Sequence, residues 1–161
     1  KLSSMSSMDV IGITGSYGKT SSKNILSDIL NIKYNAMPTP KNFNTPYGLM
    51  MTINNNLDKF NDYFIAEMGA CKKGEIKELC DLVKPKYGIL TRIGVAHLDS
   101  FKTEENIIKT KFELESFVKI RDDQIKVVID NDQHNTELAN NIMRFIQEKY
   151  ETKKYITVEF K

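Results

Sequence analysis

Residues Gly12 to Lys23 read GITGSYGKTSSK and contain a glycine-rich loop. This segment overlaps DVIGIT at residues 9–14, a predicted short strand that ends at the glycine loop, and it leads into a predicted helix at residues 18–31. Four apolar residues are expected on one side of that helix: Ile25, Leu26, Ile29 and Leu30. A glycine loop between a strand and a helix, ending in Gly-Lys-Thr, is the setting of a phosphate-binding loop. The usual pattern has a glycine five residues before Gly18, however, and Ile13 occupies that position.

Strand-like and helix-like segments alternate along the rest of the chain. Three prolines make residues 38–46 a loop. Helices are predicted at residues 47–54, 74–83, 103–119 and 136–150, and strands at residues 62–70, 86–94, 125–130 and 154–160. This alternation predicts an α/β fold, a mostly parallel sheet flanked by helices. Ligands of such sheets bind beyond the carboxyl ends of the strands, where we expect the site.

The composition argues against several classes of protein. A net charge of +2 over 161 residues, without a basic run, disfavours a nucleic-acid partner. No stretch reaches the roughly 18 apolar residues of a membrane span, and the first ten residues lack the apolar core of a signal peptide, so we expect a cytoplasmic location.

Cys71 and Cys80 form no CxxC pair and are expected to be free thiols. The first residue is Lys1 rather than Met, which indicates a piece of a longer protein.

The glycine loop has the residues that a phosphate site needs. Gly15 and Gly18 let the backbone approach an anion closely, and free N–H groups at a helix start would face it. Lys19 can reach terminal phosphates, and the hydroxyl of Thr20 can bind magnesium. The alternative is a glycine-rich turn that happens to precede a lysine.

Two further residues follow predicted strands. Glu67 ends an apolar strand, where an unpaired carboxylate is costly, so it either meets a metal beside the phosphates or pairs with a lysine in the core. His97, in IGVAHLDSF, lies just beyond the next strand and is either functional or an ordinary loop histidine. His134 has no such support and is expected on the surface.

Lys111 is centred on the apolar face of the helix predicted at residues 103–119, between Ile107 and Leu114. A lysine in this position needs an explanation. It can extend its ammonium group outwards to water, pair with a buried acid, or be modified so that it carries a negative charge. The residues alone do not choose among these three.

Taken together, five blocks resemble the Mur ligases, which make peptidoglycan precursors. They are TGSYGKTSSK, NFNTP, EMGACKKGEI, GVAHLDSF and KTKFEL, in the family's order and spacing, and the resemblance runs from about Asp9 to Asp132. The family's loop resembles T-G-S-x-G-K-T, without a glycine at the Ile13 position. The chain is most similar to the members that add D-Ala-D-Ala to a UDP-N-acetylmuramoyl-tripeptide. A related folylpolyglutamate-type or other Mur-type ligase, and a non-catalytic P-loop nucleotide-binding module, are the alternatives.

The resemblance implies a P-loop NTPase-like central domain that uses ATP and Mg²⁺. It implies an ATP cradle formed by Gly15, Ser16, Tyr17, Gly18, Lys19, Thr20 and Ser21. Thr20 and Glu67 would hold a first magnesium, and His97 with a carbamylated Lys111 a second, so that Lys19, His97 and Lys111 are the implied catalytic residues. Asn42, Asn44 and Thr45 would contact the UDP-muramoyl substrate.

The resemblance also implies a reaction and a size. The substrate's carboxylate would form an acyl phosphate with ATP, and the amine of D-Ala-D-Ala would then displace phosphate. The family has three domains, and this chain resembles the central one alone, so we expect a monomer that lacks the UDP-binding and C-terminal domains and does not ligate by itself. One residue departs from the pattern, because Asp130 stands where an asparagine near the adenine is usual.

Overall fold

A computed structural model describes residues 1–5, 7–118, 124–129, 144 and 155–160. These residues form two parallel sheets, one of four strands in the order β2-β3-β1-β4 and one of the two strands β5 and β6. The strands are β1 (Asp9–Thr14), β2 (Ala36–Pro38), β3 (Tyr63–Glu67), β4 (Tyr87–Leu90), β5 (Gln124–Ile129) and β6 (Tyr155–Phe160). The α-helices are α1 (Lys19–Leu30), α2 (Pro46–Asn55), α3 (Glu75–Val83), α4 (Leu98–Phe101) and α5 (Glu104–Lys111), with short 3₁₀ turns η1 (Leu2–Ser4) and η2 (Phe112–Ser116).

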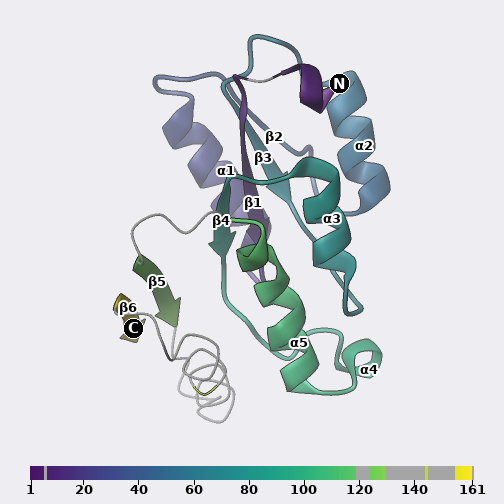
Figure 1. Ribbon diagram of the computed structural model, residues 1–161, viewed down its shortest axis with the longest axis vertical. Helices are drawn as coiled ribbons and strands as arrows, with labels where there is room; N and C mark the ends of the chain where they lie inside the picture. Colours follow the sequence, from purple (N-terminus) through teal and green to yellow (C-terminus); the bar gives the residue numbers. More distant parts are fainter. Residues whose placement is uncertain (6, 119–123, 130–143, 145–154, 161) are drawn as a thin grey trace.

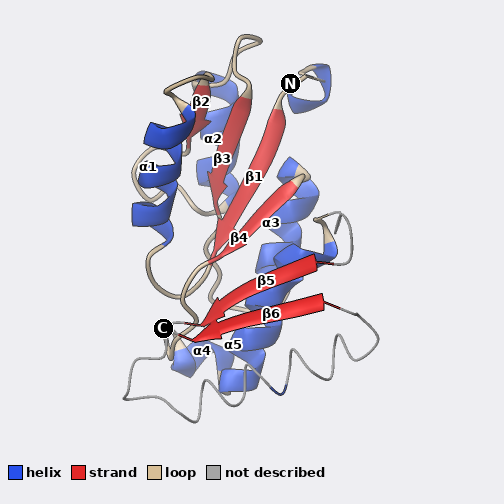
Figure 2. Cartoon of the chain, turned by 90° about the vertical axis from the view of Figure 1, so that its left-hand side faces the viewer, coloured by secondary structure: helices blue, strands red, loops and turns tan. Residues whose placement is uncertain are grey.

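The predicted α/β architecture is confirmed: a parallel sheet with helices on both faces (Figures 1 and 2). Alternate residues of the central strands enter two separate cores, as strand geometry requires. Val10 and Phe64 pack with α2, α3 and α5, whereas Ile11 and Ile65 pack with Leu26 of α1 and its neighbours. The larger core therefore lies on the face away from α1.

Several elements differ from the prediction. The strand expected at residues 86–94 ends at Leu90, because the following residues turn to contact the glycine loop. The helix expected at residues 103–119 ends at Lys111 and continues as the 3₁₀ turn η2. The two C-terminal strands were predicted correctly as strands, but they pair with each other in a separate sheet. The helix expected at residues 136–150, His134 and Asp130 lie outside the described residues.

The apolar side predicted for α1 was wrong in part. Leu26 and Leu30 pack against the sheet, but Ile25 and Ile29 are 60% and 58% exposed. The buried positions of the helix are instead Lys23 and Ser27. The helix thus turns a polar stripe towards the sheet, and this rotation brings Lys23 to the end of β3.

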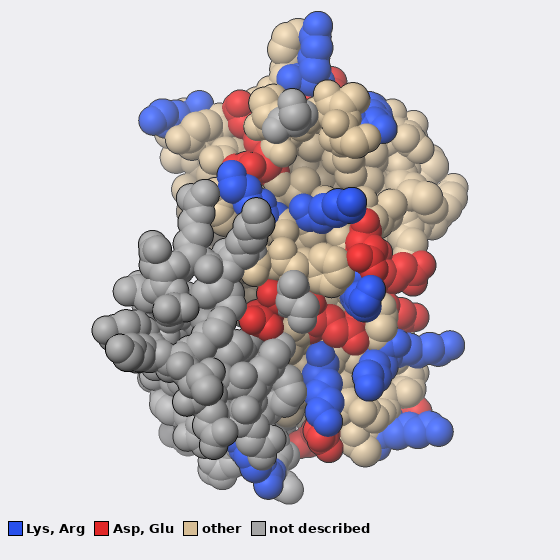
Figure 3. All heavy atoms as spheres, viewed as in Figure 1, with Lys and Arg blue, Asp and Glu red and all other residues tan. Residues whose placement is uncertain are grey.

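The surface is mixed in charge. On the face in Figure 3, acidic and basic side chains of the described residues are interspersed rather than gathered by sign. Among the described residues, no helix combines the length and apolarity that crossing a bilayer requires. Cys71 is exposed and Cys80 is buried, and both are free thiols as expected.

Candidate functional site

All four strands of the main sheet are parallel, so the loops that follow them meet at one edge. The loop after β1 is the glycine loop. The segment after β2 contains Asn44, the segment after β3 contains Cys71, and the segment after β4 contains His97. The site therefore combines residues from four separate parts of the chain, as the strand-end argument predicted.

The two loop glycines are needed for different reasons. Gly15 is buried with a φ of 147°, and a Cβ there would lie 2.0 Å from the hydroxyl oxygen of Thr91. Gly18 has a φ of 80° and open space around it, and it caps the N-terminus of α1. Both conformations are ones that glycine adopts at little cost. Gly15 thus allows close packing against Thr91, the residue that follows β4, and Gly18 allows the entry into the helix.

The glycine loop is fastened to the segment after β4. The N–H groups of Ser16 and Tyr17 donate to the carbonyl of Arg92, at 2.8 and 3.2 Å, and the Ser16 hydroxyl donates to the carbonyl of Gly94 at 2.9 Å. These two N–H groups of the loop are therefore already paired within the chain. Helix geometry leaves the first N–H groups of α1 without intrahelical acceptors, and these include Ser21. An anion would be bound by that first turn.

Lys19 lies folded over its own loop. Its ammonium group donates to the carbonyls of Gly15, at 2.9 Å, and Ser16, at 3.2 Å. Burial lowers the pKa of Lys19, and the nearby Glu67 and Cys71 oppose that shift. The side chain thus stands at the mouth of the loop with backbone carbonyls as its partners.

Glu67 is 1% exposed and uses both of its carboxylate oxygens. Its Oε2 accepts a hydrogen bond from the Thr20 hydroxyl at 2.9 Å and lies 3.1 Å from the ammonium group of Lys23. Its Oε1 accepts from the side-chain amide of Asn44 at 3.2 Å. The alternative of a core lysine partner is therefore the one that the structure shows, and the same carboxylate also contacts the first turn after the glycine loop.

Lys111 is 3% exposed, which excludes the alternative that its ammonium group extends to water. Its Nζ donates to the carbonyl of Ala70 at 3.2 Å and lies 5.7 Å from the ring centre of Phe101. Burial, and then the positive charge of Lys19, lower the pKa of Lys111 to about 8. Its amine is thus much closer to neutrality at physiological pH than that of an exposed lysine.

A contact that the sequence did not predict fixes the turn that follows Lys111. The carboxylate of Glu113 accepts hydrogen bonds from the N–H groups of Gly74, at 2.8 Å, and Lys77, at 2.9 Å. These are donors at the start of α3, so Glu113 caps that helix from a distant part of the chain. The turn that follows Lys111 is thereby fixed to the helix that follows the Cys71 segment. No local signal in the sequence points to this pairing.

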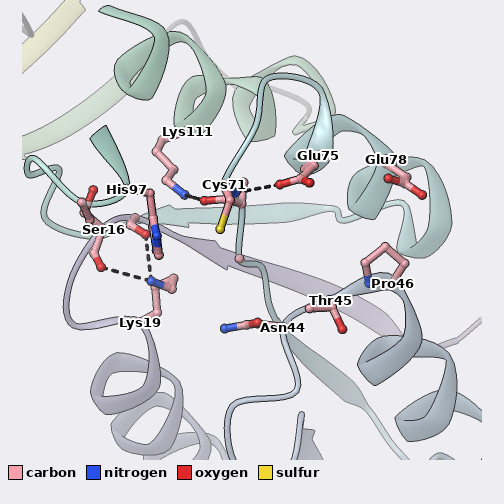
Figure 4. A pocket seen from close by; sticks show the side chains of 14 residues that line it. Ser16, Lys19, Asn44, Thr45, Pro46, Cys71, Glu75, Glu78, His97 and Lys111 are labelled. Atoms are coloured by element: carbon pink, nitrogen blue, oxygen red, sulfur yellow. Dashed lines mark hydrogen bonds between the residues drawn. The ribbon is translucent and has the colours of Figure 1, made fainter. Parts of the chain in front are cut away.

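His97 adopts a left-handed backbone conformation, with a φ of 60°, and is the N-cap residue of the short helix α4. Few residues other than glycine take this conformation. In Figure 4 the imidazole ring extends towards the end of Lys19, beside the side chain of Lys111. His97 is exposed and lines the cavity between these two lysines.

The site surrounds a cavity of about 440 Å³ (Figure 4). Seven of the predicted site residues line it: Gly15, Ser16, Lys19, Asn44, Thr45, His97 and Lys111. The other six do not: Tyr17, Gly18, Thr20, Ser21, Asn42 and Glu67. Thr20 and Glu67 join it indirectly, through Asn44, whereas Asn42 is exposed. Thr45 lines the cavity and also caps α2, since its hydroxyl accepts from the N–H of Gly48 at 3.3 Å.

The metal-binding capacity of the site is limited to a few oxygen donors. Within the ranges that the structure describes, no three His, Cys, Asp or Glu residues gather closely enough to hold a metal ion. The hydroxyl of Thr20 and the carboxylate of Glu67 lie side by side, and such hard oxygen donors suit Mg²⁺. Magnesium commonly uses one or two carboxylates and completes its shell with substrate phosphates and water. The donor set therefore fits a magnesium ion that arrives with a nucleotide.

Comparison with known proteins agrees with this geometry. Residues 13–159 match the family model described as the Mur ligase middle domain. The UDP-N-acetylmuramoyl-tripeptide–D-alanyl-D-alanine ligase of Mycobacterium leprae is 37% identical over 107 residues, which cover 66% of this chain and 20% of that protein. The Bacillus subtilis ligase of the same name is 35% identical over 105 residues, covering 65% of this chain and 23% of that protein.

Among solved structures, the MurF ligase of Thermotoga maritima in complex with ADP superposes with a TM-score of 0.70 and 33% identity. The match covers 96% of this chain and 32% of that one. The chain thus spans about a fifth of the curated relatives and about a third of the solved one.

Proposed function

This chain belongs to the Mur ligase family, and on that premise we propose that it is the central, ATP-binding domain of a ligase that adds D-Ala-D-Ala to UDP-N-acetylmuramoyl-tripeptide. The names of the Mycobacterium and Bacillus relatives support this type over a folylpolyglutamate-type ligase. The UDP-binding and C-terminal domains of the proposed enzyme would lie outside this chain. By itself the chain is expected to bind nucleotide weakly and not to ligate.

The observation that carries the proposal is the convergence of Lys19, His97 and Lys111 on one cavity, from three different elements. A phosphate loop alone would suit any nucleotide-binding module. A histidine and a buried lysine with a lowered pKa have no use in a simple nucleotide switch. They suit a site in which negative charge develops at a reacting carbonyl and phosphoryl group.

In the proposed reaction the phosphate loop binds ATP. The first turn of α1 supplies N–H groups, and Lys19 would exchange its carbonyl partners for the terminal phosphates. There its charge would offset the negative charge that spreads over the transferred phosphoryl group. The substrate carboxylate would take the γ-phosphoryl group and release ADP, and the amine of D-Ala-D-Ala would then displace phosphate to form the amide.

Magnesium is proposed beside Thr20 and Glu67, where the hydroxyl and the buried carboxylate offer adjacent oxygen donors. When bound, the ion supplies charge neutralisation on the phosphates. Asn44 donates to the same carboxylate and lines the cavity. It therefore links the proposed magnesium site to the loop proposed to contact the UDP-muramoyl substrate. Asn42 and Thr45 are the other proposed substrate residues of that loop.

Lys111 is proposed to act as its carbamate. The neutral amine would add to CO₂ and lose a proton, which replaces the positive charge with a negative one. A pKa near 8 leaves a substantial neutral fraction at physiological pH for this addition. The carbamate and His97 would then hold a second magnesium. A carbamate also answers why a lysine is buried at this position.

The first test is nucleotide binding by this chain. Calorimetric titration with ATP, with and without Mg²⁺, should show magnesium-dependent binding that Lys19→Ala abolishes and that the exposed-site control Lys33→Ala leaves intact. Binding that persists in Lys19→Ala would refute the phosphate-loop assignment. Detectable transfer of D-Ala-D-Ala by the isolated chain would refute the domain assignment.

A second test separates the ligase from a non-catalytic nucleotide module. Lys111→Ala, introduced into the complete protein, should leave ATP binding within a few-fold of wild type and abolish amide formation. Native mass spectrometry in bicarbonate should show an added CO₂ on the wild type that the variant lacks. A complete protein whose function survives Lys111→Ala would be a nucleotide module and not a ligase.

A further inference from the structure

Lys23 is buried to the same degree as Glu67, each with 1% of its side chain exposed. A charged lysine is almost never this buried unless it is paired. No role for Lys23 follows from the sequence patterns, and neither the proposed ATP binding nor the proposed carbamate uses it. Its position in α1 follows from helical spacing, because Lys19, four residues earlier, lies on the same face one turn nearer the cavity.

The ammonium group of Lys23 has two partners that belong to different parts of the site. One is Oε2 of Glu67, at 3.1 Å, the same oxygen that accepts from the Thr20 hydroxyl. The other is the carbonyl oxygen of Lys41, which accepts a hydrogen bond from it. Lys23 thus connects the carboxylate at the end of β3 with the loop that follows β2.

The backbone at Lys41 supports a specific role for the second contact. Lys41 has a φ of 48°, in the left-handed region that residues other than glycine rarely adopt. Such a conformation is strained and persists only where its surroundings determine it. The hydrogen bond from a buried ammonium group is a contact that can hold this turn, and Asn44 lies three residues further along it.

We propose that Lys23 is a positioning residue that holds the Glu67 carboxylate and the Thr39–Thr45 loop in one fixed arrangement, ready for magnesium and the nucleotide. This inference rests on the proposed function, because it assigns Glu67 to the magnesium site. A buried ion pair contributes little net stability, since desolvation offsets most of the attraction. Its effect is to exclude other arrangements of the groups around it.

The test compares Lys23→Met with wild type and with Lys33→Met, which removes an exposed lysine beyond the other end of α1. Calorimetry with ADP gives the ratio of affinities measured with Mg²⁺ and with EDTA. Lys23→Met should reduce this ratio about tenfold or more, the usual effect of losing a partner that orients a metal ligand. Lys33→Met should leave the ratio unchanged.

Hydrogen exchange of the peptide spanning residues 38–50 gives a second readout that does not depend on nucleotide. The N–H groups of Thr39 and Phe43, which donate to Ile65 and Pro40, are the protected positions of the loop. Lys23→Met should raise their exchange several-fold, whereas Lys33→Met should not. A purely stabilising lysine would lower the melting temperature without changing the magnesium ratio or this local exchange.

Each result decides the inference. A folded Lys23→Met with a wild-type magnesium ratio and wild-type exchange would overturn it. A raised ratio would also overturn it, because Lys23 would then only repel the metal. If Lys23→Met does not fold, Lys23→Gln replaces it in the test, because its uncharged amide can still donate to the carbonyl of Lys41. Lys23→Gln should keep the exchange protection of the loop and show the reduced affinity ratio. Wild type that binds no ADP would refute the proposed function for this chain, while the exchange measurement would still decide the role of Lys23.

Discussion

The hydroxyl of Thr20 donates a hydrogen bond of 2.9 Å to Oε2 of Glu67 and so joins the first turn of α1 to the end of β3. Thr20 follows the glycine loop, and Glu67 is the last residue of an inner strand of the sheet. A carboxylate held in this position could coordinate a metal ion bound to the phosphates while its side chain stays buried in the core. The pair therefore gives the first prediction.

Glu67→Gln should remove the magnesium dependence of nucleotide binding. The amide keeps the size of the side chain but loses the charge that would attract the ion. We expect the gain in ADP affinity on adding Mg²⁺ to fall about tenfold or more. Calorimetry with and without EDTA measures this gain, and Glu105→Gln, an exposed glutamate of α5, is the matched control. An unchanged gain in Glu67→Gln would place the metal elsewhere.

The same substitution should also destabilise the fold, because it leaves the charge of Lys23 buried without its partner. Breaking one side of a buried pair costs about 3 kcal/mol in the free energy of unfolding. The double variant Lys23→Met with Glu67→Gln should regain most of that loss, since no unpaired charge remains. Urea denaturation of the four proteins gives the coupling energy. Strictly additive losses would show that the two side chains do not interact.

Gly15 and Gly18 should respond differently to alanine. Gly18→Ala places a Cβ in open space and costs only the left-handed backbone strain, about 1 kcal/mol. Gly15→Ala also forces that Cβ against Thr91, so a loss of about 2–4 kcal/mol is expected. Thermal unfolding of the two variants measures the difference. Equal losses would mean that the segment after β4 moves aside freely.

Lys111 should make stability depend on pH above neutrality. Its pKa is about 8 in the folded chain against an ordinary 10.5, so between these values the unfolded chain binds more protons. The free energy of unfolding should therefore rise with pH across this window, by about 3 kcal/mol in total. Lys111→Met should lack this rise and should exceed the wild-type stability below pH 8.

Urea titrations in carbonate-free buffer at several pH values check this prediction. The control is Lys109→Met, which removes a more exposed lysine of the same helix and should follow the wild-type curve. Parallel curves for wild type and Lys111→Met would show that Lys111 is not forced towards its neutral form by folding.

Thr45 should act first as a helix cap. Its hydroxyl accepts from the N–H of Gly48 at the start of α2, so Thr45→Ala should cost about 1 kcal/mol in the free energy of unfolding. Thr45→Ser keeps the oxygen and should retain most of the stability. If both variants lose affinity for the UDP-muramoyl substrate in the complete protein while Thr45→Ser remains stable, the residue has a second role in binding.

The central elements were predictable because they depend on short-range patterns. An apolar run followed by a glycine loop and a helix predicted β1, the loop and α1 correctly. Strand β2 was missed because it is only three residues long and ends in Pro38, which an edge strand tolerates. Helix α4 was missed because a four-residue turn has no periodicity to detect.

The orientation of α1 shows where sequence patterns mislead. Four apolar residues predicted its inner side, yet Ile25 and Ile29 face outwards and Lys23 faces the sheet. Burying Lys23 is possible only because Glu67 and the carbonyl of Lys41 receive its charge. A helical wheel includes only the residues of one helix, so it cannot show those partners and places a lysine on the exposed side.

Three features were evident from the sequence alone: a glycine loop opens α1, Glu67 ends a buried strand, and Lys111 occupies an apolar face. Each of these follows from local spacing or from a single periodicity. Three contacts could be seen only in the folded chain: Lys23 pairs with Glu67, the carbonyl of Arg92 accepts from two N–H groups of the loop, and Glu113 caps α3. Those contacts join residues far apart in the chain, and their energy depends on burial and distance, which exist only once the strands have been brought side by side.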